Sequence, residues 1–209
     1  MKLLLIIIFA ITLIYLSVTE RFRTFITLIA VQGLVLFGIA FLELTDINIG
    51  NLIFIIAETL LFKAIIVPLL LGRIIKQTHI TRVHEHALPS LYALLFITFG
   101  LVISILLTYM LAKSGMVDVY FAIAFFTVYT GMFFIISHKK IFSHLIGFLV
   151  IENAVFMLSL ALGREMPMLI NIGILLDIVV SVLILGIFVN RLGNLLNAMD
   201  AKQLSELKD

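Results

Sequence analysis

The sequence has no cysteine, no tryptophan and few charged residues, and these shortages narrow its possible functions. Without cysteine, the chain forms no disulfide and binds no iron–sulfur cluster through thiolates. The net charge is only +2, and no basic patch is interleaved with aromatics, which argues against a nucleic-acid partner. No phosphate-binding glycine loop, nucleophile elbow or HExxH pattern occurs. We therefore expect no catalytic residue, no cofactor and no metal site in this chain.

What remains is mostly apolar. Hydrophobic residues make up 63% of the 209 positions and charged residues 12%, against about 25% charged in a soluble globule. The mean hydropathy is +1.28. A membrane helix needs about 20 consecutive apolar residues. The sequence therefore predicts an all-α polytopic membrane protein with seven transmembrane helices, at 3–19, 24–42, 52–72, 91–112, 117–136, 145–162 and 169–189.

The first apolar run could be mistaken for a signal peptide. It has a single basic residue before it, Lys2, no small-x-small cleavage site, and Arg21 and Arg23 directly after it. These features favour a retained first helix.

Lysine and arginine are unevenly shared between the two ends of the predicted helices. Short loops that are rich in these residues stay in the cytoplasm. The sequence thus predicts a multi-pass membrane protein with its N-terminus outside and its C-terminus in the cytoplasm. One side carries Arg21, Arg23, Arg73, Lys76, Arg82, Lys139, Lys140, Arg191, Lys202 and Lys208; the other carries Lys2, Lys113 and Arg164.

The placement of polar residues indicates an internal repeat. In the second helix of each copy a polar residue stands at mid-span, first Gln32 and then Glu152, which are 120 positions apart. In the third helix of each copy an acid stands at mid-span, first Glu58 and then Asp177, which are 119 positions apart. The expected organisation is two parallel three-helix units joined by a connector helix. The corresponding segments are a first unit 1–73, an inner loop with the connector 74–113, a second unit 114–190, and a tail 191–209. That tail reads either as a cytoplasmic amphipathic helix or as an extension of the seventh helix.

The acids Glu58, Glu152 and Asp177 are the strongest functional signal, because each lies in the middle of an apolar span. An ionisable group at this depth costs about 2.5–3.5 kcal/mol to insert. Burial disfavours the ionised form of a carboxyl group and a neighbouring cation favours it, so together they suit a group that both takes up and releases protons. These acids are candidate proton-transfer residues. The plainer alternative is that each acid, protonated, donates an interhelical hydrogen bond.

Lys63 is a fourth candidate proton-transfer residue, since it lies too deep in its span to reach the membrane surface easily. Glu58 lies five residues earlier, about 140° around an α-helix, so a partner on another helix is expected. A purely structural ion pair between helices is the alternative. Pro68 removes a backbone hydrogen bond just beyond Lys63, and we expect a kink there that exposes carbonyls.

Several polar residues are weaker candidates. Gln32, Asn153, Ser181 and His144 are possible accessory groups in proton transfer. Three histidines in the loop 73–90 are more typical of a solvated loop than of a metal site. A face of small residues on the fourth helix, Gly100, Ser104 and Thr108, is more typical of helix packing than of a hydrated path.

The stretch KKIFSHLIGFLVIENAVFMLSLALG at 139–163, followed by INIGILLDIVVSVLILGIF, resembles two helices of the K-type subunit of respiratory complex I and of the C subunit of multisubunit cation/proton antiporters. With FKAIIVPLL around Lys63 and Pro68, the whole chain resembles hydrogenase-4 component E, of the formate hydrogenlyase type. It departs from the K-type pattern at Asp177, where glutamate is usual, and at Gln32, where the repeat would place glutamate.

This resemblance implies a non-redox membrane-arm subunit of an energy-converting hydrogenase or complex I-like assembly, in a prokaryotic inner membrane. Its implied partners are antiporter-like membrane subunits and a hydrogenase or quinone-module membrane subunit, and its acids would contribute to a proton path. Two alternatives stay open at this point: a subunit of a cation/proton antiporter without a redox arm, and a structural packing subunit or stand-alone small transporter. The sequence does not establish that the chain is itself an enzyme.

Overall fold

The described part of the chain is entirely helical. The computed structural model describes residues 1–19, 21–43, 52–53, 55–78, 89–111, 116–138 and 141–162. The elements are α1 (Lys2–Val18), α2 (Phe22–Glu43), the π-helix η1 (Ile56–Ile66), which continues directly into α4 (Val67–Thr78), α5 (Ser90–Leu111), α6 (Met116–Ser137) and α7 (Ile141–Leu162). Helices are expected in so apolar a chain, because a helix satisfies its backbone polar groups within its own segment.

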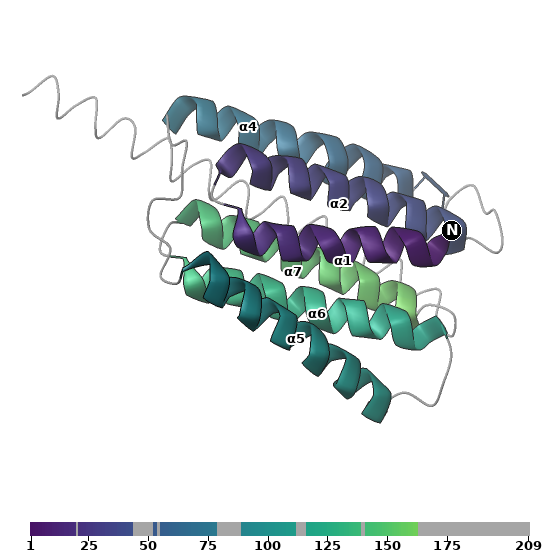
Figure 1. Cartoon of the computed structure of the whole chain (residues 1–209). Coiled ribbons are helices and arrows are strands. Elements are labelled where there is room, and N and C mark those ends of the chain that lie inside the picture. The colour runs from purple at the N-terminus through teal and green to yellow at the C-terminus, as the bar shows by residue number, and fades with distance from the viewer. Residues whose placement is uncertain are drawn as a thin grey trace, which may run out of the picture.

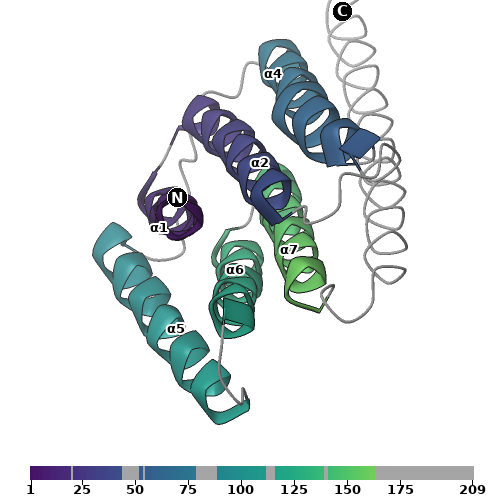
Figure 2. The same cartoon turned by 90° about the vertical axis from the view of Figure 1, so that its right-hand side faces the viewer.

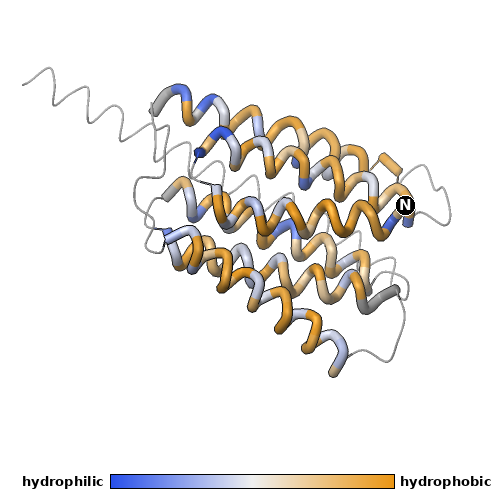
Figure 3. The backbone as a smooth tube through the Cα atoms, viewed as in Figure 1, coloured by the Kyte–Doolittle hydropathy of each residue, from blue (hydrophilic) through white to orange (hydrophobic). Residues whose placement is uncertain are grey.

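Four of these helices are long and apolar enough to cross a membrane: Phe22–Glu43, Ser90–Met110, Val119–Ser137 and Phe142–Ala161. The helix Lys2–Val18 is apolar but shorter. Hydrophobic residues dominate along the helices in Figure 3, and hydrophilic ones gather toward several of their ends. The chain thus has the build of a helical membrane protein. The predicted span 169–189 and the tail 191–209 lie outside the described residues.

The six predicted spans that fall in the described part each coincide with a helix, with some shifted ends. The third was expected to stop at residue 72, yet α4 continues to Thr78. The sixth was expected to begin at residue 145, yet α7 begins at Ile141. In both places the helix extends beyond the apolar run, because polar residues near a helix end need not interrupt its backbone hydrogen bonds.

The helices lie side by side in two rows, seen end-on in Figure 2. One row is α1, α2 and η1 with α4; the other is α5, α6 and α7. Helix α2 packs on α7 across the two rows, and α1 packs on α5 and α6. The chain direction alternates, so the start of α2 and the end of α4 lie at one end of the bundle in Figure 1, here named the basic end because Arg21, Arg23, Arg73 and Lys76 lie there.

Close packing at small residues holds the second row together. A Cβ atom built on Gly131 of α6 would lie 2.7 Å from the carbonyl oxygen of Gly147 in α7, and one on Gly147 would lie 2.8 Å from the carbonyl oxygen of Gly131. A Cβ on Gly100 of α5 would meet the ring of Tyr129 in α6 at 2.1 Å. Small residues at these positions let the helix backbones approach.

The face predicted from Gly100, Ser104 and Thr108 is thus a packing face, as expected. The side chains of Ser104 and Thr108 are buried. Each hydroxyl donates to a carbonyl four residues earlier in its own helix, at 2.8 Å in both cases. This satisfies the hydroxyls locally and leaves the face free to pack.

The π-helix η1 precedes the proline that was expected to disturb this span. The backbone N–H of Val67 donates to the carbonyl of Phe62, five residues earlier, instead of four. Pro68 has no N–H and cannot continue the ladder. The segment before Pro68, which contains Glu58 and Lys63, is thus wound as a π-helix and continues directly into α4.

Candidate functional site

Five polar side chains from four different helices are buried at the middle of the bundle, and we name them the polar layer: Thr12 of α1, Gln32 of α2, Lys63 of η1, and Glu152 and Asn153 of α7. Gln32 is 0% exposed, Glu152 4% and Lys63 5%. Polar groups are kept at such positions only where they find partners or perform a function, since burying them in hydrocarbon is costly.

Three of these side chains form a continuous chain of hydrogen bonds between α7, α2 and α1. The amide nitrogen Nδ2 of Asn153 donates to Oε1 of Gln32 at 3.0 Å. The amide nitrogen Nε2 of Gln32 donates to Oγ1 of Thr12 at 3.2 Å. The hydroxyl of Thr12 donates to the carbonyl oxygen of Phe9 at 2.6 Å, one turn back in α1. Within the polar layer, these bonds therefore run across the bundle from α7 through α2 to α1.

A glycine brings η1 against this chain. A Cβ atom on Gly33, next to Gln32, would lie 2.8 Å from the backbone nitrogen of Ala64 and 3.0 Å from the carbonyl carbon of Lys63. A side chain at position 33 would therefore push the two helices apart. The absence of one lets the backbone of η1 approach α2 at the depth of Gln32.

Lys63 also contacts α7 from η1. Its ammonium nitrogen lies 5.3 Å from the centroid of the Phe156 ring, within the range of a cation–π interaction. Phe156 is itself buried and lies one turn after Glu152 on the same face of α7. The cation of the polar layer thus lies against the helix that carries the buried acid.

The wide winding of η1 changes one expectation about Glu58. The angle of about 140° between positions 58 and 63 assumed α-helical geometry. In a ladder that joins residues five apart, these two positions lie about one turn apart instead. The argument against a pair within this helix is therefore wrong in its geometry. The side chain of Glu58 lies outside the described part.

The remaining predicted site residues do not join the polar layer within the described part of the chain. Asp177 and Ser181 lie outside the described residues. His144 lies eight residues before Glu152 on α7, about 12 Å along the helix axis. Its Nε2 is 2.6 Å from the carbonyl oxygen of His138, at the turn between α6 and α7. This contact places His144 in the turn at the basic end.

Sequence reasoning missed two members of this site, Thr12 and Phe156. Thr12 is a polar residue at the middle of the first span, and the mid-span rule that identified Gln32 would have found it. Phe156 carries no such signal, because an aromatic residue in an apolar helix is ordinary core. The Phe156 ring belongs to the site only because Lys63, on another helix, lies over it.

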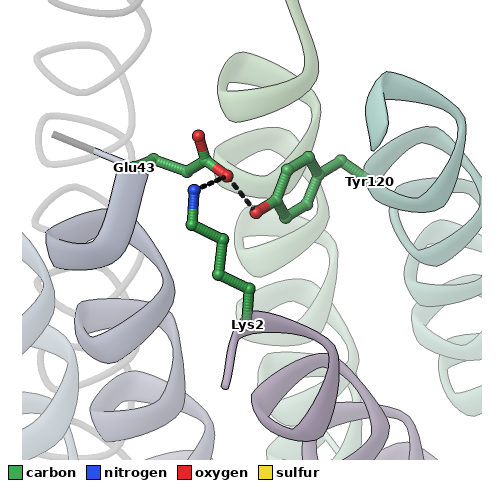
Figure 4. Close-up of polar contacts among 3 residues, drawn as sticks. All are labelled: Lys2, Glu43 and Tyr120. Carbon is green, nitrogen blue, oxygen red and sulfur yellow. Dashed lines mark hydrogen bonds and ion pairs between the residues drawn. The ribbon is translucent and has the colours of Figure 1, made fainter. Parts of the chain in front are cut away.

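A second polar cluster lies at the end of the bundle opposite the basic end (Figure 4). Oε1 of Glu43, at the end of α2, accepts hydrogen bonds from the ammonium group of Lys2 at 2.9 Å and from the hydroxyl of Tyr120 at 2.5 Å. The three residues tie α2 to α1 and α6. No sequence pattern singles out this cluster, since an acid at the end of a span is typical of an ordinary interfacial residue.

We expect Glu43→Gln to lower the stability of the folded chain by about 0.5–1 kcal/mol, because a partly exposed ion pair contributes little. The glutamine keeps an oxygen for Lys2 and Tyr120 but loses the charge. The unfolding midpoint of the full chain in detergent micelles measures the change. Tyr120→Phe, which removes only the hydroxyl, should cost a similar or smaller amount, and unchanged midpoints in both variants would contradict a stabilising cluster.

The apolar helices and the buried polar layer place the chain among helical membrane proteins. The chain is similar to a protein of Mycobacterium tuberculosis named "Uncharacterized protein Rv0085", with 25% identical residues over 190 positions, which are 90% of this chain and 86% of that protein. No family model matches the chain, and no solved structure matches it. The relative's name states no activity, so the function is argued from the site.

Proposed function

We propose that this chain is a non-redox membrane-arm subunit of an energy-converting hydrogenase, formate hydrogenlyase or complex I-like assembly, and that its buried ionisable residues contribute to a proton-translocation path. The observation that supports this most is the polar layer, in which Glu152 and Lys63 are buried at mid-bundle on neighbouring helices. The resemblance of the segments around Glu152, Asp177 and Lys63 to component E of hydrogenase-4 gives the proposal its particular assembly.

A proton path needs groups that change protonation without unfolding the protein. Glu152 offers a carboxyl group from α7 and Lys63 an ammonium group from η1, and both of these helices pack on α2. A purely structural subunit would need neither group, since apolar residues pack as well and cost less to bury. Glu58 and Asp177 would extend the path within the third and seventh spans.

The proposal includes the orientation of the chain. The basic end would lie on the cytoplasmic side of a prokaryotic cell membrane, and the cluster of Lys2, Glu43 and Tyr120 on the outer side. The path would run in the membrane plane, toward antiporter-like subunits on one side and a hydrogenase or quinone-module membrane subunit on the other.

Purification of the tagged full chain from its native membranes in mild detergent tests the partners. We expect it to bring down antiporter-like membrane subunits together with soluble subunits that hold iron–sulfur clusters or a nickel site, identified by mass spectrometry. Membranes from cells that carry an untagged chain control for nonspecific recovery. Recovery of antiporter subunits with no redox subunit would instead support a cation/proton antiporter, and a chain that is stable and active alone would contradict both.

A further inference from the structure

The hydrogen-bond chain ends at a backbone carbonyl in α1, and this carbonyl fixes the direction of every bond in the chain. A backbone carbonyl oxygen can only accept, so the hydrogen between Thr12 and Phe9 belongs to the Thr12 hydroxyl. The Thr12 hydroxyl has only one hydrogen and donates it to Phe9. Its oxygen, Oγ1, can therefore only accept a hydrogen bond from Gln32. The atom of Gln32 that lies 3.2 Å from it must therefore be a donor, the amide nitrogen.

The same reasoning passes along the chain to α7. With its nitrogen at Thr12, Gln32 turns its amide oxygen toward Asn153. That oxygen can only accept, so Asn153 must present its own amide nitrogen at 3.0 Å. The oxygen and nitrogen of a side-chain amide are nearly equivalent in shape, but here the carbonyl of Phe9 decides between the two orientations of both amides.

We infer that Thr12 and Gln32 are positioning residues that fix the orientation of the Asn153 amide, and that this arm of the polar layer does not itself carry protons. Its members are two amides and a hydroxyl, which keep their protons near neutral pH. It ends on the backbone carbonyl of Phe9, which cannot transfer a proton any further. In the part of the polar layer that the structure describes, protonation changes are left to Glu152 and Lys63. Gln32 and Asn153 were named above as possible accessory groups in proton transfer, and positioning is the accessory role that the inference gives them.

Asn153 lies close in sequence to two other residues of the site on α7. Its nitrogen is committed to Gln32, so its oxygen remains as an acceptor for another donor. Glu152 is the preceding residue, and Phe156, beneath the Lys63 ammonium, is three residues on. The statement that protonation changes are left to Glu152 and Lys63 rests on the proposed function; the direction of the hydrogen bonds does not.

Magnetic-resonance spectroscopy of the full chain in lipid vesicles tests the direction, with isotope-labelled asparagine and glutamine side chains. We expect stronger through-space transfer from the Asn153 amide nitrogen to Cδ of Gln32 than from the Gln32 amide nitrogen to Cγ of Asn153. Loss of the signal in Asn153→Leu assigns it. The reverse order of intensities would overturn the inference without the need for any other variant.

Thr12→Val tests whether the far end of the chain controls Asn153, which Thr12 does not touch in the bonds described above. Valine has nearly the shape of threonine but neither accepts nor donates, so Gln32 loses the partner that fixes its amide. We expect the single Asn153 amide signal to split into two, one for each orientation, and Thr12→Ser to restore a single signal. A single unshifted signal in Thr12→Val would assign Thr12 to packing alone.

These outcomes separate the inference from the proposed function. If Glu152→Gln leaves coupled proton translocation intact, the proposed function fails, while the spectra still decide the direction of the chain. If the spectra show the reverse direction and Glu152 remains essential, only the positioning role fails.

Discussion

Replacing Glu152 by glutamine is expected to reduce coupled proton translocation by about 10²-fold or more while the chain stays folded and assembled. Glutamine matches the size of the glutamate and retains an oxygen acceptor, but it cannot take up and release a proton. Because Glu152 is buried within α7, between neighbouring helices, the exchange of one oxygen for an NH₂ group changes its packing little. The loss would therefore report on proton transfer.

The measurement is proton uptake into inverted membrane vesicles, followed with a pH-sensitive dye while the assembly turns over. A native gel of the same membranes shows whether the assembly is intact. Glu43→Gln is the matched control, since it makes the same chemical change at the end of the bundle, outside the polar layer, and should keep most of the flux. Full coupled flux in Glu152→Gln would exclude a relay through this residue. Asp177→Asn makes the corresponding test in the seventh span.

Gly33→Ala is expected to destabilise the fold by about 3 kcal/mol, at the upper end of what overpacking costs. The added Cβ would meet the backbone nitrogen of Ala64 at 2.8 Å and the carbonyl carbon of Lys63 at 3.0 Å. Backbone atoms cannot turn aside as a flexible side chain does, so η1 must move away from α2. This displacement would also shift Lys63 relative to Phe156.

Gly72→Ala is the matched control. Gly72 lies in α4, which continues directly from η1, and a Cβ atom added there meets nothing within 4 Å. Removing this glycine from a helix is expected to be neutral or to stabilise the chain by up to about 1 kcal/mol. Unfolding of the full chain in mixed micelles, titrated with a denaturing detergent, gives both values. Equal unfolding midpoints for the two variants would contradict the close approach of α2 and η1.

The sequence predicts the helices well for a simple physical reason. A bilayer demands runs of about 20 apolar residues, and such runs are visible without knowledge of the fold. Where charge or polarity begins before the helix ends, as at Arg73 in α4, the apolar run marks the end too early. The π-helical winding of η1 is not visible in the same way, because Pro68 indicates a broken ladder but not how the backbone before it adjusts.

The polar layer was only partly predictable. Mid-span position identified Gln32, Lys63 and Glu152, and the structure buries these side chains and that of Asn153 within three helices. Which helices touch depends on the packing of small residues such as Gly33, whose partner on η1 lies 31 positions away in the chain. The direction of the hydrogen bonds depends on the backbone carbonyl of Phe9, which any residue at position 9 would supply.

The winding of η1 shifts the helical phase of α4, the segment that follows it. A ladder that joins residues five apart holds more residues in each turn than the neighbouring α-helices do. The side chains of α4, Arg73 and Lys76 among them, are therefore out of phase with any helical wheel that begins at Ile56 and assumes 3.6 residues per turn. A wheel for α4 has to be started afresh at Val67.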